Sequence, residues 1–220
     1  FMGSSSEMLE YSKEATKKNV EVLNPNIKLS TDEFEVINGK IYFPLSIIKG
    51  LGEIKTKQCI EERTKVQFKD YEDFVERTKD FLAISLLENI IYSGALDDFG
   101  LTKKAMIENL KSIIDRSNYG FIKDMIKTDY TDEEFSYGIL QEKELEVIGI
   151  NIKYNFYQQF ASFYSKYNLV KIANLSENKE ARTIGTVKRV RETKTKNNET
   201  MAFVEITDDT SNIEIVLFPM

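Results

Sequence analysis

The chain has 220 residues, a formal net charge of −6 and 41% hydrophobic residues, as expected for a globular protein of one medium or two small domains. It has no histidine and one cysteine, which excludes a histidine general base, a histidine-based triad and zinc sites built from histidine or paired thiolates. No apolar run reaches the roughly 18–20 residues of a membrane span.

The start of the chain, residues 1–10, is interpreted as an added tag. Its first six residues have neither the basic flank nor the apolar core of a secretion signal. The lone Cys59 cannot form an internal disulfide. We therefore expect a cytoplasmic protein with no membrane partner.

Apolar spacing and turn residues predict most elements in chain order. We expect a helix over 7–23 and a hairpin over 33–46 that turns at Asn38-Gly39. Helices follow over about 53–64, 70–79 and 80–92, and another begins after a cap at Thr102. Thr131 and Glu134 form the pattern of a capping box for a last helix over 131–149.

Beyond residue 181 the pattern changes to strands. Apolar and polar residues alternate over three short runs, which predicts a three-stranded antiparallel meander. Three strands are too few for a closed barrel, so the last domain is expected to be truncated. The predicted fold class is α+β, with a mainly helical module followed by a short antiparallel sheet.

The turn at Gly50-Leu51-Gly52 carries half of a phosphate-binding fingerprint. Position 55, where a dinucleotide fold needs a third glycine, is Lys55, and no P-loop motif follows. Two interpretations stay open: a plain helix-starting turn, or a turn whose N–H groups meet a phosphate. A second small-residue turn over 93–100 favours paired helix-hairpin-helix units, which clip the backbone of a DNA duplex.

Two acidic motifs are interpreted as structural elements and not as catalytic or metal-binding sites. The Asp-Phe-Gly at 98–100 lacks the companion motifs of a kinase. Asp208-Asp209 lies between two predicted strands, where aspartate is favoured in turns. We therefore predict no catalytic residue, no metal ligand and no cofactor in this chain.

Basic residues gather in two segments despite the acidic total. Residues 181–198 hold six basic side chains against one acid, and residues 49–69 hold six against three. Such segments suit phosphate contacts, and an ordinary solvated face is the alternative. Phe203 either stacks a base or packs in a core.

Four collinear segments resemble one family. They are "FPLSIIKGLGEIKTKQCIEERT", "LLENIIYSGALDDFGLTKKAMIENL", "LQEKELEVIGI" and the strand region from Thr183 to Pro219. Their order is similar to the alpha subunit of bacterial DNA polymerase III of the DnaE type. The resemblance implies the end of the fingers region over 11–46, a tandem helix-hairpin-helix module over 47–130, a helical connector over 131–180 and the first strands of an OB-fold over 181–220.

By resemblance, the chain would hold primer-template duplex and lie near single-stranded template during DNA replication. The parent enzyme is a DNA-directed DNA polymerase, a nucleotidyltransferase that uses Mg²⁺ bound by palm aspartates, which this chain lacks; alone it should be inactive. The sliding clamp and clamp loader are further implied partners, although residues 117–126 lack the glutamine of the clamp peptide. The predicted DNA-binding residues are Lys49, Gly50, Leu51, Gly52, Glu53, Ile54, Lys55, Lys57, Ser93, Gly94, Ala95, Lys188, Arg189, Arg191, Lys194, Lys196 and Phe203.

Two other functions are weighed against this interpretation. The chain could tether a polymerase to its clamp or loader, with glycines that are merely structural. It could also be a stand-alone helix-hairpin-helix repair protein, which the collinear order of the four segments disfavours.

Overall fold

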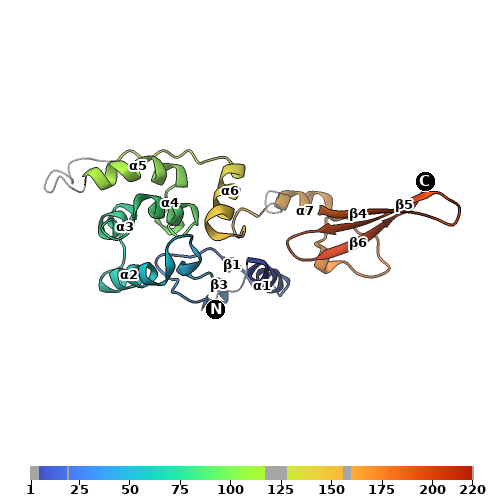
Figure 1. The fold of residues 1–220 in the computed structure, drawn as a ribbon, viewed down its shortest axis with the longest axis horizontal. Coiled ribbons are helices and arrows are strands. Elements are labelled where there is room, and N and C mark those ends of the chain that lie inside the picture. Colours follow the sequence, from blue (N-terminus) through green and yellow to red (C-terminus); the bar gives the residue numbers. More distant parts are fainter. Residues whose placement is uncertain (1–4, 19, 117–127, 156–159, 220) are drawn as a thin grey trace. The chain divides into compact units, whose positions relative to one another are not determined.

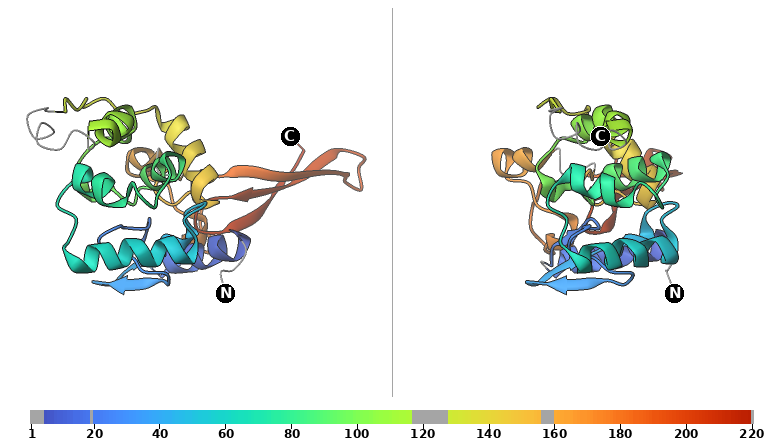
Figure 2. Two further views of the ribbon diagram at one scale, coloured as in Figure 1. Left: turned by 60° about the vertical axis from the view of Figure 1, so that its left-hand side comes forward. Right: turned by 90° about the vertical axis from the view of Figure 1, so that its left-hand side faces the viewer.

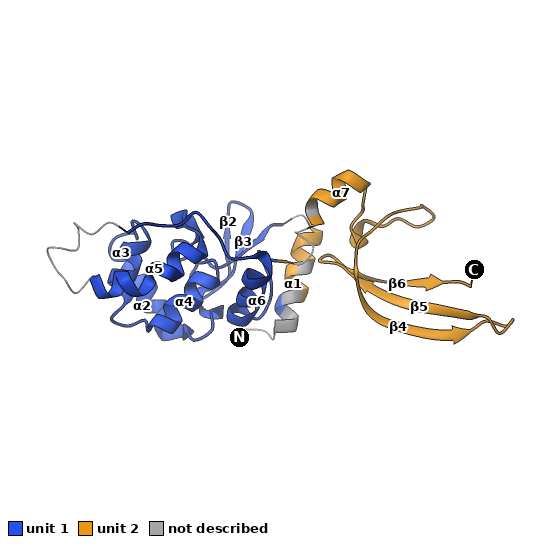
Figure 3. Ribbon diagram, turned by 90° about the horizontal axis from the view of Figure 1, so that it is seen from above, with its two compact units in different colours: residues 1–8, 20–154 blue, residues 9–19, 155–220 orange. Residues whose placement is uncertain are grey.

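A computed structural model describes residues 5–18, 20–116, 128–155 and 160–219. The chain divides into two compact units, residues 1–8 with 20–154 and residues 9–19 with 155–220 (Figure 3). Helix α1 (Ser5–Lys17) contributes residues to both. The predicted α+β class is confirmed, since a helical module precedes a three-stranded antiparallel sheet (Figure 1). Whether that sheet belongs to an OB-fold stays a prediction.

The first unit opens with a small sheet of strand order β1-β3-β2. Strand β2 (Glu35–Ile37) pairs antiparallel with β3 (Lys40–Tyr42), and β1 (Val22–Leu23) pairs parallel with β3. Asn38 and Gly39 have φ angles of 52° and 77°, the left-handed pair that a tight two-residue hairpin requires. The predicted Asn-Gly hairpin is thus confirmed.

The described residues of this unit also form five further α-helices and two short 3-10 turns. They are η1 (Leu45–Ile47), α2 (Gly52–Lys65), α3 (Tyr71–Thr78), α4 (Ile84–Tyr92), η2 (Asp97–Phe99), α5 (Lys103–Arg116) and α6 (Tyr137–Ile148). The β2–β3 hairpin runs alongside α2 in both views of Figure 2. One continuous core joins these elements, with Leu51, Phe74 and Ile90 at 1% exposure or less.

The second unit holds α7 (Ala161–Tyr167), η5 (Ile172–Asn174) and a sheet of order β4-β5-β6. Its strands β4 (Thr186–Lys194), β5 (Thr200–Thr207) and β6 (Asn212–Leu217) are antiparallel. Asp208 caps the β5–β6 turn: its carboxylate accepts the N–H groups of Thr210 and Ser211. That contact confirms the assignment of Asp208 to a turn.

Three predicted boundaries were wrong, two of them because a distant segment competes for the same groups and one because of a local turn. Helix α1 ends at Lys17, and residues 22–23 form a strand because β3 offers them hydrogen bonds. Helix α4 begins at Ile84, after a turn closed by Leu82 N–H to Thr78 O at 2.8 Å. Helix α6 begins only at Tyr137, so Thr131 and Glu134 form no capping box.

Glu134 instead caps the start of α5. Its two carboxylate oxygens accept the N–H groups of Lys103 and Lys104 at 2.9 and 3.0 Å. The predicted cap at Thr102 is confirmed, since its hydroxyl accepts Ala105 N–H at 3.1 Å. The N–H groups at the start of α5, which have no acceptor within the helix, are therefore bound by side chains from two segments, Thr102 and Glu134.

Candidate nucleic-acid interface

The turn before α2 is fixed by its own buried residues and by two other helices. Ile48 and Leu51 are each 1% exposed and anchor the turn in the core. The N–H of Lys49 donates to Val147 O of α6 at 2.8 Å, and Asn89 Nδ2 of α4 donates to Lys49 O at 2.9 Å. The backbone between the two anchors is therefore held in one position.

The atoms that this turn presents to solvent are backbone atoms. Gly50 and Gly52 are exposed and have φ angles of 84° and 57°, which a side chain would strain. The N-cap residue Leu51 has no side-chain hydrogen bond to the helix. The first N–H groups of α2 therefore lie at the positive end of its dipole, in exposed residues and without a side-chain cap.

The lysines around this turn stand beside carboxylates. Lys57 Nζ lies 2.6 Å from Glu53, and this hydrogen bond lowers the pKa of Glu53 and raises the pKa of Lys57. Lys49 Nζ lies 3.6 Å from Glu146, whose shorter contact, 2.9 Å, is with Lys143. Both pairs are solvent-exposed and weak, so neither carboxylate holds its lysine in a fixed position.

The remaining predicted residues of this turn differ in exposure. Ile54 is 78% exposed, which is unusual for a large apolar side chain at the start of a helix. Lys55 is half-buried on α2. The structure thus brings Lys49, Gly50, Gly52 and Glu53 together at one exposed end of α2, with Leu51 beneath them.

The second predicted turn has a different environment. Ser93, Gly94 and Ala95 are buried, and their N–H groups donate to Asn89 O, Ile91 O and Ser93 Oγ. These three N–H groups are therefore not free to bind a phosphate.

A separate segment, residues 24–27, covers the second turn. Asn24 Nδ2 donates to Ser93 O at 2.7 Å, and Ile27 N–H donates to Ala95 O at 2.9 Å. The predicted DNA contact at Ser93, Gly94 and Ala95 thus lacks the exposed groups that the first turn has.

The basic residues of the sheet are dispersed over three environments. Arg189 and Arg191 share one face with Phe203, and the Arg191 guanidinium lies 4.8 Å from the Phe203 ring centroid. Lys194 projects from the opposite face of β4 by strand alternation. Lys188 lies at a register shift between Val187 and Arg189, and Lys196 lies in the β4–β5 turn.

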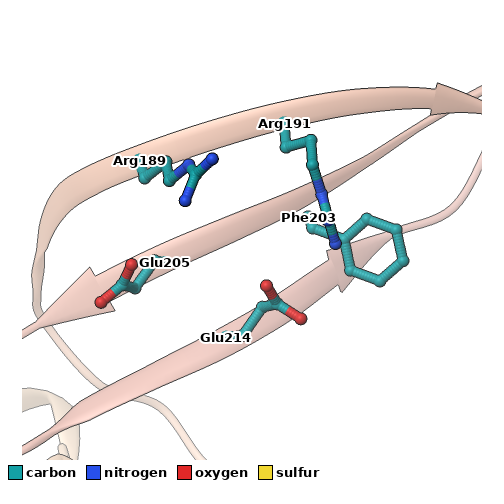
Figure 4. Close-up of a pocket in the computed structure, with 5 residues that line it drawn as sticks. All are labelled: Arg189, Arg191, Phe203, Glu205 and Glu214. Atoms are coloured by element: carbon teal, nitrogen blue, oxygen red, sulfur yellow. The ribbon is translucent and has the colours of Figure 1, made fainter.

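Sequence reasoning missed four acidic residues around these sites. Glu205 and Glu214 line a small pocket together with Arg189, Arg191 and Phe203 (Figure 4). The spacing of Phe203 and Glu205, two residues apart on a strand, already places them on one face. Glu146 lies beside Lys49 of the first turn, and Glu144 accepts Asn24 Nδ2, which also donates to Ser93 O of the second turn. The sequence offers no local signal for these contacts.

Three other findings bear on function. The described residues contain no group of three or more histidine, cysteine, aspartate or glutamate side chains placed to hold a metal ion. Among the described helices none is both long and apolar enough to cross a membrane. The predicted clamp-peptide position, 117–126, lies outside the described residues.

Known proteins match the chain along nearly its whole length. A model of the helix-hairpin-helix motif matches residues 19–106. The DNA polymerase III subunit alpha of Staphylococcus aureus (strain MRSA252) is 29% identical over 227 residues, which cover 99% of this chain and 21% of that protein. The subunit of the same name from Helicobacter pylori (strain J99) is 29% identical over 244 residues, covering 94% and 20%.

The helix-hairpin-helix match lies almost entirely within the first unit and includes the glycine turn and α2. The chain contains a helix-hairpin-helix module, in which α2 follows the exposed glycine turn. It is homologous to a region of the DNA polymerase III alpha subunit. The chain spans about one fifth of the length of the curated relatives it matches.

Proposed function

We propose that this chain is a noncatalytic, DNA-holding part of a replicative DNA polymerase. It holds primer-template duplex through sequence-independent contacts to the DNA backbone. The observation that carries this proposal is the exposed, uncapped start of α2, fixed by Lys49 N–H to Val147 O and by Asn89 to Lys49 O. The homology to a DNA polymerase III subunit supports it.

The mechanism is electrostatic and uses main-chain donors. A phosphate at the start of α2 would accept N–H groups at the positive end of the helix dipole. Gly50 and Gly52 have no Cβ that would hold the phosphate away. Lys49, Lys55 and Lys57 add mobile positive charge nearby. Such contacts to the duplex backbone ignore base sequence.

The second unit has a different role in this proposal. The face of the sheet that carries Arg189, Arg191 and Phe203 would lie against single-stranded template. Guanidinium groups and aromatic rings both stack on unpaired bases, and the arginines also attract phosphates. Lys188, Lys194 and Lys196 would contribute general positive charge to this region.

The chemistry of the whole polymerase lies outside this chain. We infer that a longer cytoplasmic protein carries the Mg²⁺-dependent nucleotidyltransferase site, because this chain matches only 21% and 20% of the length of the polymerase subunits that it resembles. The chain alone is therefore expected to bind DNA without extending a primer. Contact with the sliding clamp or clamp loader would be a separate property of the full-length protein.

Duplex titrations at several salt concentrations test the proposal. Replacing Lys49, Lys55 and Lys57 together by alanine should flatten the slope of log K against log salt by up to about 3. The control triple replaces Lys65 at the far end of α2, Lys69 in the loop between α2 and α3, and Lys111 on α5 by alanine, which removes the same charge away from the first turn. An unchanged slope in the first variant, or an equal loss in the control, would refute the proposal.

A further inference from the structure

The face of the sheet shown in Figure 4 has an ordered set of charges across its three strands. Arg189 is the register partner of Glu205, and Glu205 is the register partner of Glu214. In the neighbouring row, Phe203 pairs with Arg191 and with Val216. The side chains of Arg189, Arg191, Phe203, Glu205 and Glu214 line one pocket of about 90 Å³.

This arrangement has an electrostatic cost in the free protein. Glu205 and Glu214 stand directly opposite each other, and like charges at such cross-strand positions destabilise a sheet. Arg189 is the one cation in their row. No ion pair among the described residues includes either glutamate. A ligand that brings hydrogen-bond donors to these carboxylates would offset that cost.

The neighbouring row provides a platform for a flat ligand. Phe203 is half-buried, so its ring is held by the sheet while part of it stays open to solvent. Arg191 is exposed and lies over this ring at 4.8 Å. Both groups stack on nucleobases, and Arg189 can pair with the adjoining phosphate. The pocket therefore combines a stacking surface, a phosphate partner and two hydrogen-bond acceptors.

We propose that this pocket binds an unstacked base of single-stranded DNA and selects bases with an amino group over thymine. Cytosine, adenine and guanine each offer exocyclic N–H donors that a carboxylate can accept, as glutamate accepts from cytosine N4. Thymine offers carbonyl oxygens on both sides of its one N–H, and these oxygens are repelled by Glu205 and Glu214. The selection thus comes from the two glutamates, and the stacking comes from Phe203 and Arg191.

This inference rests on the proposed role of the sheet in binding single strands, and the two can be tested separately. Fluorescence anisotropy would give Kd for oligo(dC), oligo(dA) and oligo(dT) of equal length at slightly alkaline pH. The measured quantity is the ratio of Kd for oligo(dT) to Kd for oligo(dC). Differences between the free oligonucleotides cancel when this ratio is compared between variants.

The variants E205Q and E214Q should lower this ratio by about three- to tenfold, a partial loss of base discrimination. The matched control is E192Q, because Glu192 is exposed on the opposite face of β4 and the charge change is the same. It should shift affinity for all oligonucleotides alike and leave the ratio unchanged.

Each outcome decides one of the two claims. If F203L weakens binding to every oligonucleotide but E205Q and E214Q leave the ratio unchanged, base selection is refuted and single-strand binding stands. If E192Q changes the ratio as much as E214Q does, base selection is also refuted. If the unaltered chain binds no single strand, both claims fail, while the duplex proposal for α2 is unaffected.

Discussion

The side chain of Glu144 joins α6 to residues 152–154 and to Asn24, which covers the second turn of the helix-hairpin-helix module, and its replacement gives a decisive test of the fold. Glu144 lies on α6 and is 0% exposed. Its Oε2 accepts the N–H groups of Ile152 and Tyr154, each at 3.0 Å. Its Oε1 accepts Lys153 N–H at 3.0 Å and Asn24 Nδ2 at 2.6 Å.

The variant E144Q keeps the shape of the side chain but converts one acceptor oxygen into a donor. Each carboxylate oxygen accepts two N–H groups. Whichever oxygen the glutamine NH₂ replaces, the two N–H groups bound there face a donor and lose their acceptor. Each unsatisfied buried donor costs about 1–3 kcal/mol. Burial also raises the pKa of Glu144 by penalising its charged form, and glutamine avoids that penalty. We therefore expect a net loss of about 2–4 kcal/mol in the free energy of unfolding.

Urea unfolding followed by far-UV circular dichroism would measure this loss, because helices of the first unit dominate that signal. The control is E142Q on the same helix, since Glu142 is exposed. It should change stability by less than about 0.5 kcal/mol, the usual limit for a surface substitution. A loss below 1 kcal/mol in E144Q, or equal losses in the two variants, would show that the four hydrogen bonds do not organise this unit.

Two further predictions concern individual charges. Replacing Glu53 by glutamine should raise duplex affinity about two- to fivefold by removing a negative charge beside the phosphate site, and E61Q on the same helix should have a smaller effect in the same titration. Burial would raise the pKa of Asp208, but hydrogen bonds from Ile172 N–H, Thr210 and Ser211 outweigh it and lower the pKa. Asp208 therefore stabilises the second unit above the pKa of an unfolded aspartate, and this contribution disappears as pH falls through the lower folded value. Thermal unfolding of D208N should show a loss of about 1–3 kcal/mol at neutral pH that disappears in acid, and a pH-independent loss would contradict this reasoning.

The sequence predicted best those features that a few neighbouring residues determine. Asn38-Gly39 is sufficient for the hairpin because both residues tolerate positive φ angles. Thr102 caps α5 through a bond to a residue three positions away. Gly149 ends α6 in the left-handed conformation, at the residue where the predicted helix was expected to end. In each case the deciding interaction is local in sequence.

The sequence failed where a distant segment competes for the same group. Thr131 and Glu134 have the spacing of a capping box, but Glu134 accepts N–H groups of α5 at residues 103 and 104. Residues 22–23 have helix-compatible spacing but pair with β3. Glu144 accepts N–H groups from residues 8 to 10 positions ahead and from Asn24, 120 positions before it, and neither separation belongs to a regular sequence pattern.

The two hairpin turns have unequal roles, although the sequence presents them as a pair. The first is exposed at Gly50, Gly52 and Glu53, and the second is covered by the segment that contains Asn24. Helix α4 leads into the second turn and also supplies Asn89, which holds the backbone of Lys49. The second hairpin therefore supports the backbone of the first one, and the exposed groups that we propose meet a phosphate lie at the start of α2.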